Sequence, residues 1–291
     1  MKEKVFITKI KNYESLTVDI MYEGIKHFPS IMNCKGKSIL LKPNIVEYDP
    51  QFSINTDPQF INILITLLQD LGAYKIFVGE SPGHRRDIHN LLYQTGLGRI
   101  LKKKNVEFVD LNSCKIQSIP NLGGFTNLDE FYIGGMGLDI DVLISLPKLK
   151  THHFTGITCS IKNLLGMAAG TIYGWPKNLF HVIGLDKSIA DLFVSIKPDF
   201  AIVDGVVAME GNGPLHGESV QCGLIIMGDN LPAVDAVCAG LIGLDPLKID
   251  YLKLIETKGF NIRIESIRQL GKTVDQCKRR FALLPIMKRY R

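Results

Sequence analysis

The sequence predicts an α/β fold in which a mostly parallel sheet is covered by helices on both faces. Short apolar runs of four or five residues recur along the chain, as expected for buried strands. Stretches in which apolar residues recur every three or four positions separate these runs and indicate helices. Glycine, proline, asparagine and aspartate mark the boundaries. Strands that alternate with helices in this way are typical of parallel sheets.

The first elements follow from apolar spacing and from capping residues. Residues 4–10 are expected to form a strand and 16–27 a helix, because apolar residues recur there at helical spacing. The apolar run 38–41 is expected to be a buried strand. The next helix should begin at Pro58, since proline suits the first helical position and the preceding Thr-Asp pair can cap it. Gly72 should end it.

The middle of the chain continues the alternation and then departs from it. Residues 75–78 and 106–111 are expected strands, and a helical stretch at 87–104 is interrupted at its two glycines. The segment 116–137 is irregular and Gly-rich. There we expect a small antiparallel excursion with a short strand at 131–133.

The second half returns to the main sheet. The apolar run 142–146 is an expected strand, and 188–196 has amphipathic helical spacing. A strand at 200–203 should end at the turn Asp204-Gly205. A further strand at 223–227 leads through Asp229-Asn230 into a helix at 232–242.

Length and composition limit the organisation of the chain. The chain has 291 residues, 46% of them hydrophobic, and a net charge of +5. We expect one α/β domain over residues 1–260 and a C-terminal helical extension with a basic tail over 261–291. No apolar run is long enough for a transmembrane segment, and the N-terminus lacks a signal peptide's apolar region, so we expect a cytoplasmic protein.

The six cysteines are scattered, and no two lie within four residues of each other. This spacing excludes a local CxxC pair and a ferredoxin-type run, so no intrinsic ferredoxin-type cluster is expected. Most are expected to be reduced, buried thiols. Cys159 is a candidate nucleophile, because a place at a helix N-terminus can depress a thiol pKa.

The lysine-rich stretch 147–166 is the strongest candidate for a site. It follows the expected strand 142–146, carries three lysines, two histidines and several hydroxyls, and is expected to run as a loop into a helix beginning near Ser160. Lysines next to a helix N-terminus are suited to holding an anion. The alternative is a solvated basic loop that caps a helix.

Other polar clusters also follow apolar strands. In a parallel sheet the carboxyl ends of the strands share one edge, so these clusters are expected to converge there. A cationic group with acids nearby suits an anionic substrate, a divalent metal or general acid–base chemistry. The candidate catalytic residues are His152, Glu80, Glu210 and Cys159; the candidate anion-binding residues are Lys42, Asn44, Lys148, Lys150, Lys162, Asn163, Gly211, Asn212 and Gly213; and the candidate metal ligands are Asp204, Glu210, Asp235 and Asp57.

Several of these residues have structural alternatives. Asp57 and Asp235 are placed where helix caps or first-turn acids are common. Asp204 can belong to a simple turn. His181 and His216 are more typical of satisfied hydrogen-bonding residues than of ligands.

The motifs together resemble the DUF362 family, whose name records an unknown function. The resemblance covers about residues 38–260 and implies an α/β domain with these motifs as its presumed site. Many members carry a ferredoxin-like 4Fe-4S module beside this domain, and this sequence lacks that cysteine run. The matching motifs are Lys42-Pro43-Asn44, Asn55-Thr56-Asp57-Pro58, Val78-Gly79-Glu80, Pro147 to His152, Ser160 to Gly166, Asp204-Gly205 with Glu210 to Pro214, and Ala233-Val234-Asp235.

Three functions remain open at this level. The leading hypothesis is an enzyme that acts on a small phosphate- or carboxylate-bearing metabolite, with a divalent metal as an optional cofactor. The second is a redox protein that uses a cluster held by a partner protein or by its scattered cysteines. The third is a noncatalytic nucleic-acid-binding protein that uses the basic tail 278–291, although a solvated tail is the commoner case and the mildly basic composition does not by itself demand nucleic acid.

Overall fold

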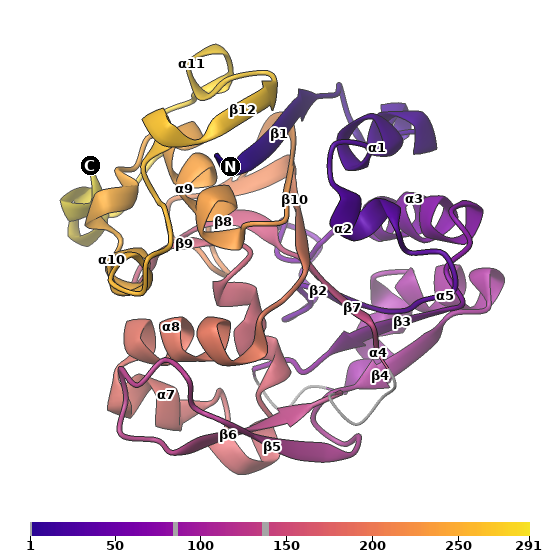
Figure 1. Ribbon diagram of the computed structural model, residues 1–291, viewed down its shortest axis with the longest axis horizontal. Helices are drawn as coiled ribbons and strands as arrows, with labels where there is room; N and C mark the ends of the chain where they lie inside the picture. The colour runs from indigo at the N-terminus through magenta and orange to yellow at the C-terminus, as the bar shows by residue number, and fades with distance from the viewer. Residues whose placement is uncertain (1, 84–86, 136–139) are drawn as a thin grey trace.

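The computed structural model describes residues 2–83, 87–135 and 140–291 and has one large mixed sheet at its centre (Figure 1). Eight strands run in the order β12-β1-β11-β10-β7-β2-β3-β4, and β8 and β9 extend the sheet beside β10. The strands of this sheet are β1 (Lys4–Lys9), β2 (Ser38–Pro43), β3 (Lys75–Glu80), β4 (Glu107–Asp110), β7 (Val142–Leu146), β8 (Lys148–His152), β9 (Gly156–Thr158), β10 (Phe200–Glu210), β11 (Glu218–Gly228) and β12 (Arg268–Gly271).

The sheet is mostly parallel, as predicted. The run β10-β7-β2-β3-β4 is parallel throughout, whereas β11 pairs antiparallel with both β10 and β1. The parallel strands therefore end at a common edge, where Pro43 of β2 lies opposite Leu146 of β7. Residues at the ends of β2 and β3 are brought together at this edge.

Helices cover both faces of the sheet, which confirms the second part of the prediction (Figure 1). Adjacent residues of β2 show the division, because Ile39 and Leu41 join one hydrophobic core and Leu40 joins the other. The first core is closed by α1 (Val18–Ile25), α2 (Pro29–Met32), α3 (Pro58–Asp70), α4 (Ile88–Gln94) and α5 (Leu97–Lys104), and the second by η2 (Lys162–Met167), α6 (Gly170–Tyr173), α7 (Asn178–Ile183), α8 (Leu185–Ile196), α9 (Leu231–Leu241) and α10 (Asp250–Glu256).

The antiparallel excursion is a two-stranded sheet of β5 (Ile116–Pro120) and β6 (Glu130–Gly134). Residues 136 and 137 of the predicted segment lie outside the described residues. The buried carboxylate of Asp191 on α8 holds the turn between the strands, since it accepts hydrogen bonds from the N–H groups of Phe125 and Thr126. This sheet therefore packs as a fixed part of the domain.

Two elements near the predicted site differ from the sequence interpretation. The expected loop 147–152 is strand β8, which pairs with β9 and with β10, so its lysines project from a strand. The expected helix near Ser160 is the short 3-10 segment η2, with no helix dipole of useful length. The prediction of an anion site at a helix N-terminus is therefore wrong in its geometry.

β10 is also longer than predicted. It continues through Asp204-Gly205 to Glu210 and forms a long hairpin with β11, with a register shift between Gly205 and Val207. The expected turn is instead this irregularity, because the polar Asp204 is satisfied inside the strand by neighbouring donors.

The C-terminal segment 261–291 is closely attached to the sheet. β12 pairs with β1, and the side chains of Phe281, Met287 and Tyr290 are buried. The other short elements of the described residues are η1 (Tyr13–Ser15), η3 (Pro246–Lys248), η4 (Ile264–Ser266), α11 (Val274–Cys277) and η5 (Pro285–Tyr290). The domain boundary at residue 260 stays a prediction.

Across the described ranges, no helix combines the length and apolar character needed to cross a bilayer.

Candidate functional site

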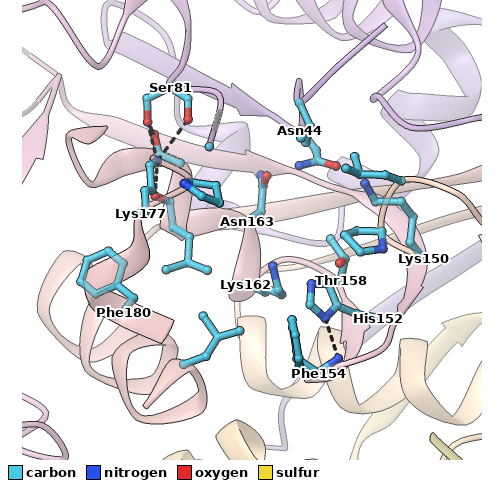
Figure 2. Close-up of a pocket in the computed structure, with 18 of the residues that line it drawn as sticks. Asn44, Ser81, Lys150, His152, Phe154, Thr158, Lys162, Asn163, Lys177 and Phe180 are labelled. Carbon is cyan, nitrogen blue, oxygen red and sulfur yellow. Dashed lines mark hydrogen bonds between the residues drawn. The ribbon is translucent and has the colours of Figure 1, made fainter. Parts of the chain in front are cut away.

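A cavity of about 270 Å³ lies where β2, β3 and the β8–β9 hairpin meet η2 and α7 (Figure 2). Its volume is at the small end of ligand pockets, so it suits a small metabolite. Seven of the predicted anion-binding or catalytic residues line it. They are Lys42, Asn44, Glu80, Lys150, His152, Lys162 and Asn163.

Lys42 and Glu80 form a buried ion pair in the wall of the cavity. Lys42 Nζ lies 2.6 Å from Glu80 Oε2, and both side chains are almost completely buried. The carboxylate also accepts hydrogen bonds from the N–H groups of Ile45, at 3.0 Å, and Ser81, at 2.8 Å. Burial lowers the pKa of Lys42, and Glu80 opposes that shift. Glu80 is therefore committed to Lys42 and to backbone donors.

Gly166 and Asn163 fit closely around this pair. A Cβ at Gly166 would overlap Glu80 Oε1 and Lys42 Nζ, so any other residue there would force the ion pair or the backbone to shift. The Asn163 amide donates to the Lys42 carbonyl at 2.8 Å and to Ser145 Oγ at 3.1 Å. Asn163 thus holds the end of β2 in place.

Lys150, Lys162 and Lys177 differ from Lys42. In the part of the chain that the structure describes, no carboxylate lies within ion-pair distance of these three lysines. Burial lowers the pKa of Lys162 to about 8 and that of Lys177 to about 7, and it lowers the pKa of Lys150 well below its usual value. Nearby lysines add to the shifts of Lys150 and Lys177. The three amines therefore share the cavity without a direct ion-pair partner in the described residues, although Asp186 raises the pKa of Lys162 and Glu80 raises those of Lys150 and Lys177 from a longer distance.

The three lysines are held differently. Lys177 Nζ donates to Ser81 O, Ser81 Oγ and Leu165 O at 2.6–3.1 Å, so all its protons are used. Its backbone has φ 66°, a left-handed conformation that is rare for a side chain of this size. Lys150 Nζ donates at 2.9 Å to Ile54 O. Lys150 therefore keeps donors for a ligand.

His152 is a buried, neutral imidazole. Its Nδ1 accepts from the N–H groups of Phe154, at 3.2 Å, and Thr155, at 3.3 Å, so the proton is on Nε2. Burial, followed by the charge of Lys162, keeps its pKa well below the usual range. His152 can therefore donate a hydrogen bond through Nε2 at neutral pH.

Part of the remaining wall is apolar and is supported by the C-terminus. Phe154, Leu165 and Phe180 line the cavity. Tyr290 donates from its hydroxyl to Phe154 O at 2.7 Å and packs its ring against Gly156. The basic tail is thus part of the hairpin's support.

Lys148 belongs to a second cluster, outside the cavity lining. Lys148 Nζ lies 2.6 Å from Asp204 Oδ2, and Tyr13 donates to the same carboxylate. The N–H of Asp57 also donates to Asp204 Oδ2, at 2.9 Å, and the Asp57 side chain caps α3 by accepting from Gln59 N. Lys148, Asp57 and Asp204 are therefore engaged with one another.

Asp235 and Cys159 lie in the core behind the hairpin. The Asp235 carboxylate accepts from Ser160 N and Oγ, Ile161 N and Tyr251 Oη. Cys159 is fully buried, and burial raises the pKa of its thiol well above the usual value. This environment corrects the expectation that Cys159 is an activated nucleophile.

The Glu210–Gly213 segment supports the site from outside. Glu210 Oε2 accepts from Ala282 N at 2.9 Å, and Gly211 N donates to Ala282 O at 3.0 Å. A Cβ at Gly213 would overlap Thr151 O, so the glycine serves close packing against β8. Gly211, Asn212 and Gly213 do not line the cavity, although the following Pro214 does.

The four acids predicted as metal ligands are not gathered into one site. Within residues 2–83, 87–135 and 140–291, no three His, Cys, Asp or Glu side chains form a group that could hold a metal ion. Asp204, Glu210 and Asp235 are each satisfied by different protein donors. Metal binding stays a prediction.

Sequence reasoning missed part of the cavity. Lys177 lies in the segment 166–185, where apolar residues show no clear helical or strand period. The signal in the sequence is a single basic residue next to Trp175-Pro176. His181 was assigned an ordinary hydrogen-bonding role. The polar and aromatic lining residues absent from the predicted set are Ser81, His153, Phe154, Thr158, Lys177, Phe180 and His181.

Comparisons with known proteins identify a family and a curated relative. A family described as "Domain of unknown function (DUF362)" matches residues 39–240. The "Thylakoid-associated protein sll1697" of Synechocystis sp. is 31% identical over 238 residues, which is 78% of this chain and 69% of that protein.

Two solved structures resemble the chain distantly. One is a Thermotoga maritima protein, with a TM-score of 0.46 and 14% identity over 86% of this chain and 59% of that one. The other is the lactate racemase apoprotein of Thermoanaerobacterium thermosaccharolyticum, with a TM-score of 0.45 and 13% identity over 88% of this chain and 57% of that one. The chain spans less than two thirds of either structure.

Proposed function

This chain belongs to the DUF362 family, and from that premise we propose that it is an enzyme acting on a small anionic metabolite. One observation carries the proposal: Lys150, Lys162 and Lys177 surround one cavity without a carboxylate partner in the described chain. A charged amine in such a cavity, without a direct ion-pair partner, costs free energy that a bound anion can offset. A phosphate or carboxylate is the natural occupant.

Lys150 and Lys162 are the direct ligands in this proposal. Lys150 retains two ammonium protons beyond its bond to Ile54 O, and Lys162 extends into the same space in Figure 2. Lys177 contributes its charge from behind Ser81. Lys148 has no direct part, because Asp204 neutralises it outside the cavity.

Proton transfer is the chemistry that these groups support. The pKa of Lys162, about 8, allows this amine to give and accept protons near neutral pH. His152 supplies a fixed Nε2–H donor that can stabilise negative charge on the substrate. Glu80 positions Lys42 and does not touch the reacting atoms.

Calorimetric titration with glycerol 3-phosphate and phenylacetate tests anion binding. The parent protein should bind at least one, and Lys150→Met and Lys162→Met should each weaken binding at least about tenfold through loss of a charge-assisted hydrogen bond. Lys75→Met, at a half-exposed lysine on β3, is the matched control. Unchanged binding in both cavity variants would overturn the proposal.

Hydrogen–deuterium exchange tests the proposed proton transfer separately from binding. Bound phenylacetate, incubated in D₂O, should exchange the C–H between its ring and its carboxylate, where the electron pair left by deprotonation can delocalise, and NMR would detect the exchange. Lys162→Met should abolish this exchange, whereas exchange at the parent rate would remove Lys162 from the chemistry. A redox partner and a cytoplasmic location stay predictions from the sequence.

A further inference from the structure

Two oxygen atoms in the cavity wall lack a hydrogen-bond partner in the described structure. They are Thr158 Oγ1 and Asn44 Oδ1, and both residues are at least nine-tenths buried. Buried polar groups normally have partners, because an unmade hydrogen bond there costs free energy. Both residues line the cavity that holds Lys150 and Lys162.

The backbone fixes both side chains. Thr158 on β9 is the cross-strand partner of Lys150 on β8, so the two side chains share a face of the hairpin. Asn44 exchanges hydrogen bonds with Thr56, since Asn44 N donates to Thr56 Oγ1 and Thr56 N donates to Asn44 O. Figure 2 shows Asn44, Lys150 and Thr158 on one side of the cavity, across from Lys177 and Phe180. An anion held by Lys150 therefore lies near both oxygens.

We propose that the occupant is a hydroxylated anion, with a neutral hydroxyl a few atoms from its phosphate or carboxylate. This proposal rests on the anion-binding function proposed above and adds a second recognised group to the ligand. The hydroxyl would donate to Thr158 Oγ1 or Asn44 Oδ1. An ammonium group could donate too, but Lys150 and Lys162 disfavour a further positive charge. The apolar wall at Phe154, Leu165 and Phe180 accepts the rest of the molecule.

Matched ligand pairs test the proposal by calorimetric titration. The pairs are glycerol 3-phosphate against propyl phosphate, and mandelate against phenylacetate; only the first member of each carries a hydroxyl. The parent protein should bind the hydroxylated member of at least one pair about tenfold more tightly. Thr158→Val should remove this preference and leave the affinity for the other member unchanged, and Thr158→Ser should restore it.

Thr151→Val is the matched control. Thr151 is a buried threonine of the same hairpin whose hydroxyl donates to Gly211 O, outside the cavity lining. This variant should keep the preference for the hydroxylated member.

The outcomes separate the two proposals. Equal affinity for both members of each pair, lost in Lys150→Met, would overturn the hydroxyl requirement and leave anion binding in place. A preference retained in Thr158→Val would also overturn the assignment of Thr158. Anion binding that is insensitive to Lys150→Met and Lys162→Met would overturn the proposed function itself.

Discussion

Lys42 Nζ lies 2.6 Å from Glu80 Oε2 in the wall of a cavity whose other lysines have no carboxylate partner in the described chain. The lysines of the site therefore fall into two groups. Lys42 is neutralised by the protein, whereas Lys150, Lys162 and Lys177 leave positive charge for a ligand. Position in the sequence does not distinguish these roles, since all four are lysines near strand or loop ends.

Breaking the Lys42–Glu80 pair should destabilise the fold. Glu80→Gln leaves the Lys42 ammonium buried without a counter-ion, and such a loss costs about 3–5 kcal/mol of the free energy of unfolding. Urea denaturation at pH 7 measures it. Glu107→Gln, at an exposed pair with Lys75, is the control and should change the value by less than about 0.5 kcal/mol. If Glu80→Gln and Glu107→Gln both changed the free energy of unfolding equally little, the buried pair would contribute nothing to stability.

Gly166→Ala should disturb the same ion pair by steric overlap, without removing a charge. The added Cβ meets Glu80 Oε1 and Lys42 Nζ, so the ion pair or the η2 backbone must shift, at a cost of about 1–3 kcal/mol. Gly83→Ala is the matched control, because its Cβ would meet only Pro176 at 3.7 Å. Thermal melts of both variants measure the difference. Two equally stable proteins would contradict the close approach.

Anion affinity should fall as the pH rises from about 7 to about 9. Burial lowers the pKa of Lys162 to about 8 and of Lys177 to about 7, so both lose charge in this interval. Binding should also take up protons, which calorimetry in buffers of different ionisation enthalpy detects. Lys162→Met should flatten the profile. A parent profile that is already flat would contradict the lowered pKa values.

The ligand-free protein should show the opposite trend in stability. Because the folded pKa of Lys177 is lower than that of an unfolded lysine, the unfolded chain binds more protons between about pH 7 and pH 10. The free energy of unfolding should therefore gain from this group as the pH rises through that window. Lys177→Met should remove the gain, and urea titrations at several pH values would measure it.

Cys159 should resist alkylation in the native protein. Its thiol is fully buried and its pKa is raised, whereas Cys114 and Cys222 are partly exposed. Iodoacetamide followed by peptide mass spectrometry should therefore modify Cys114 or Cys222 first. Cys159→Ala should leave anion affinity unchanged. Rapid modification of Cys159 would restore it as a candidate nucleophile.

The fold could be predicted from the sequence because apolar spacing reports burial directly. The run at 38–41 becomes β2, and its alternate residues enter two cores, as a strand covered on both faces requires. The same reasoning failed at 147–152. Its lysines and histidines led to the prediction of a loop, yet β8 buries them in a strand because its neighbours supply acceptors for some amines and a cavity for others.

Site residues that directly follow a strand could be predicted from the sequence. Site residues that reach the cavity only through the three-dimensional fold were missed. Lys42, Asn44 and Glu80 are at or beside the ends of β2 and β3, and parallel pairing brings them together. Lys177 reaches the cavity from a segment without periodicity, through bonds to Ser81 almost a hundred residues away in sequence. Glu80 is the one predicted acid among the described residues that line the cavity, whereas Asp204 and Asp235 accept hydrogen bonds from donors elsewhere.

The cavity's walls come from stretches of the chain that are remote from one another, at residues 42–46, 80–83, 150–166, 176–185 and 214–215. No single stretch can form it, so the cavity disappears whenever the sheet comes apart. A ligand that fits it therefore acts on the equilibrium between the native and the unfolded protein, and the melting temperature should rise with its free concentration. A melting assay on the unmodified protein can consequently screen metabolites without any prior assumption about the reaction.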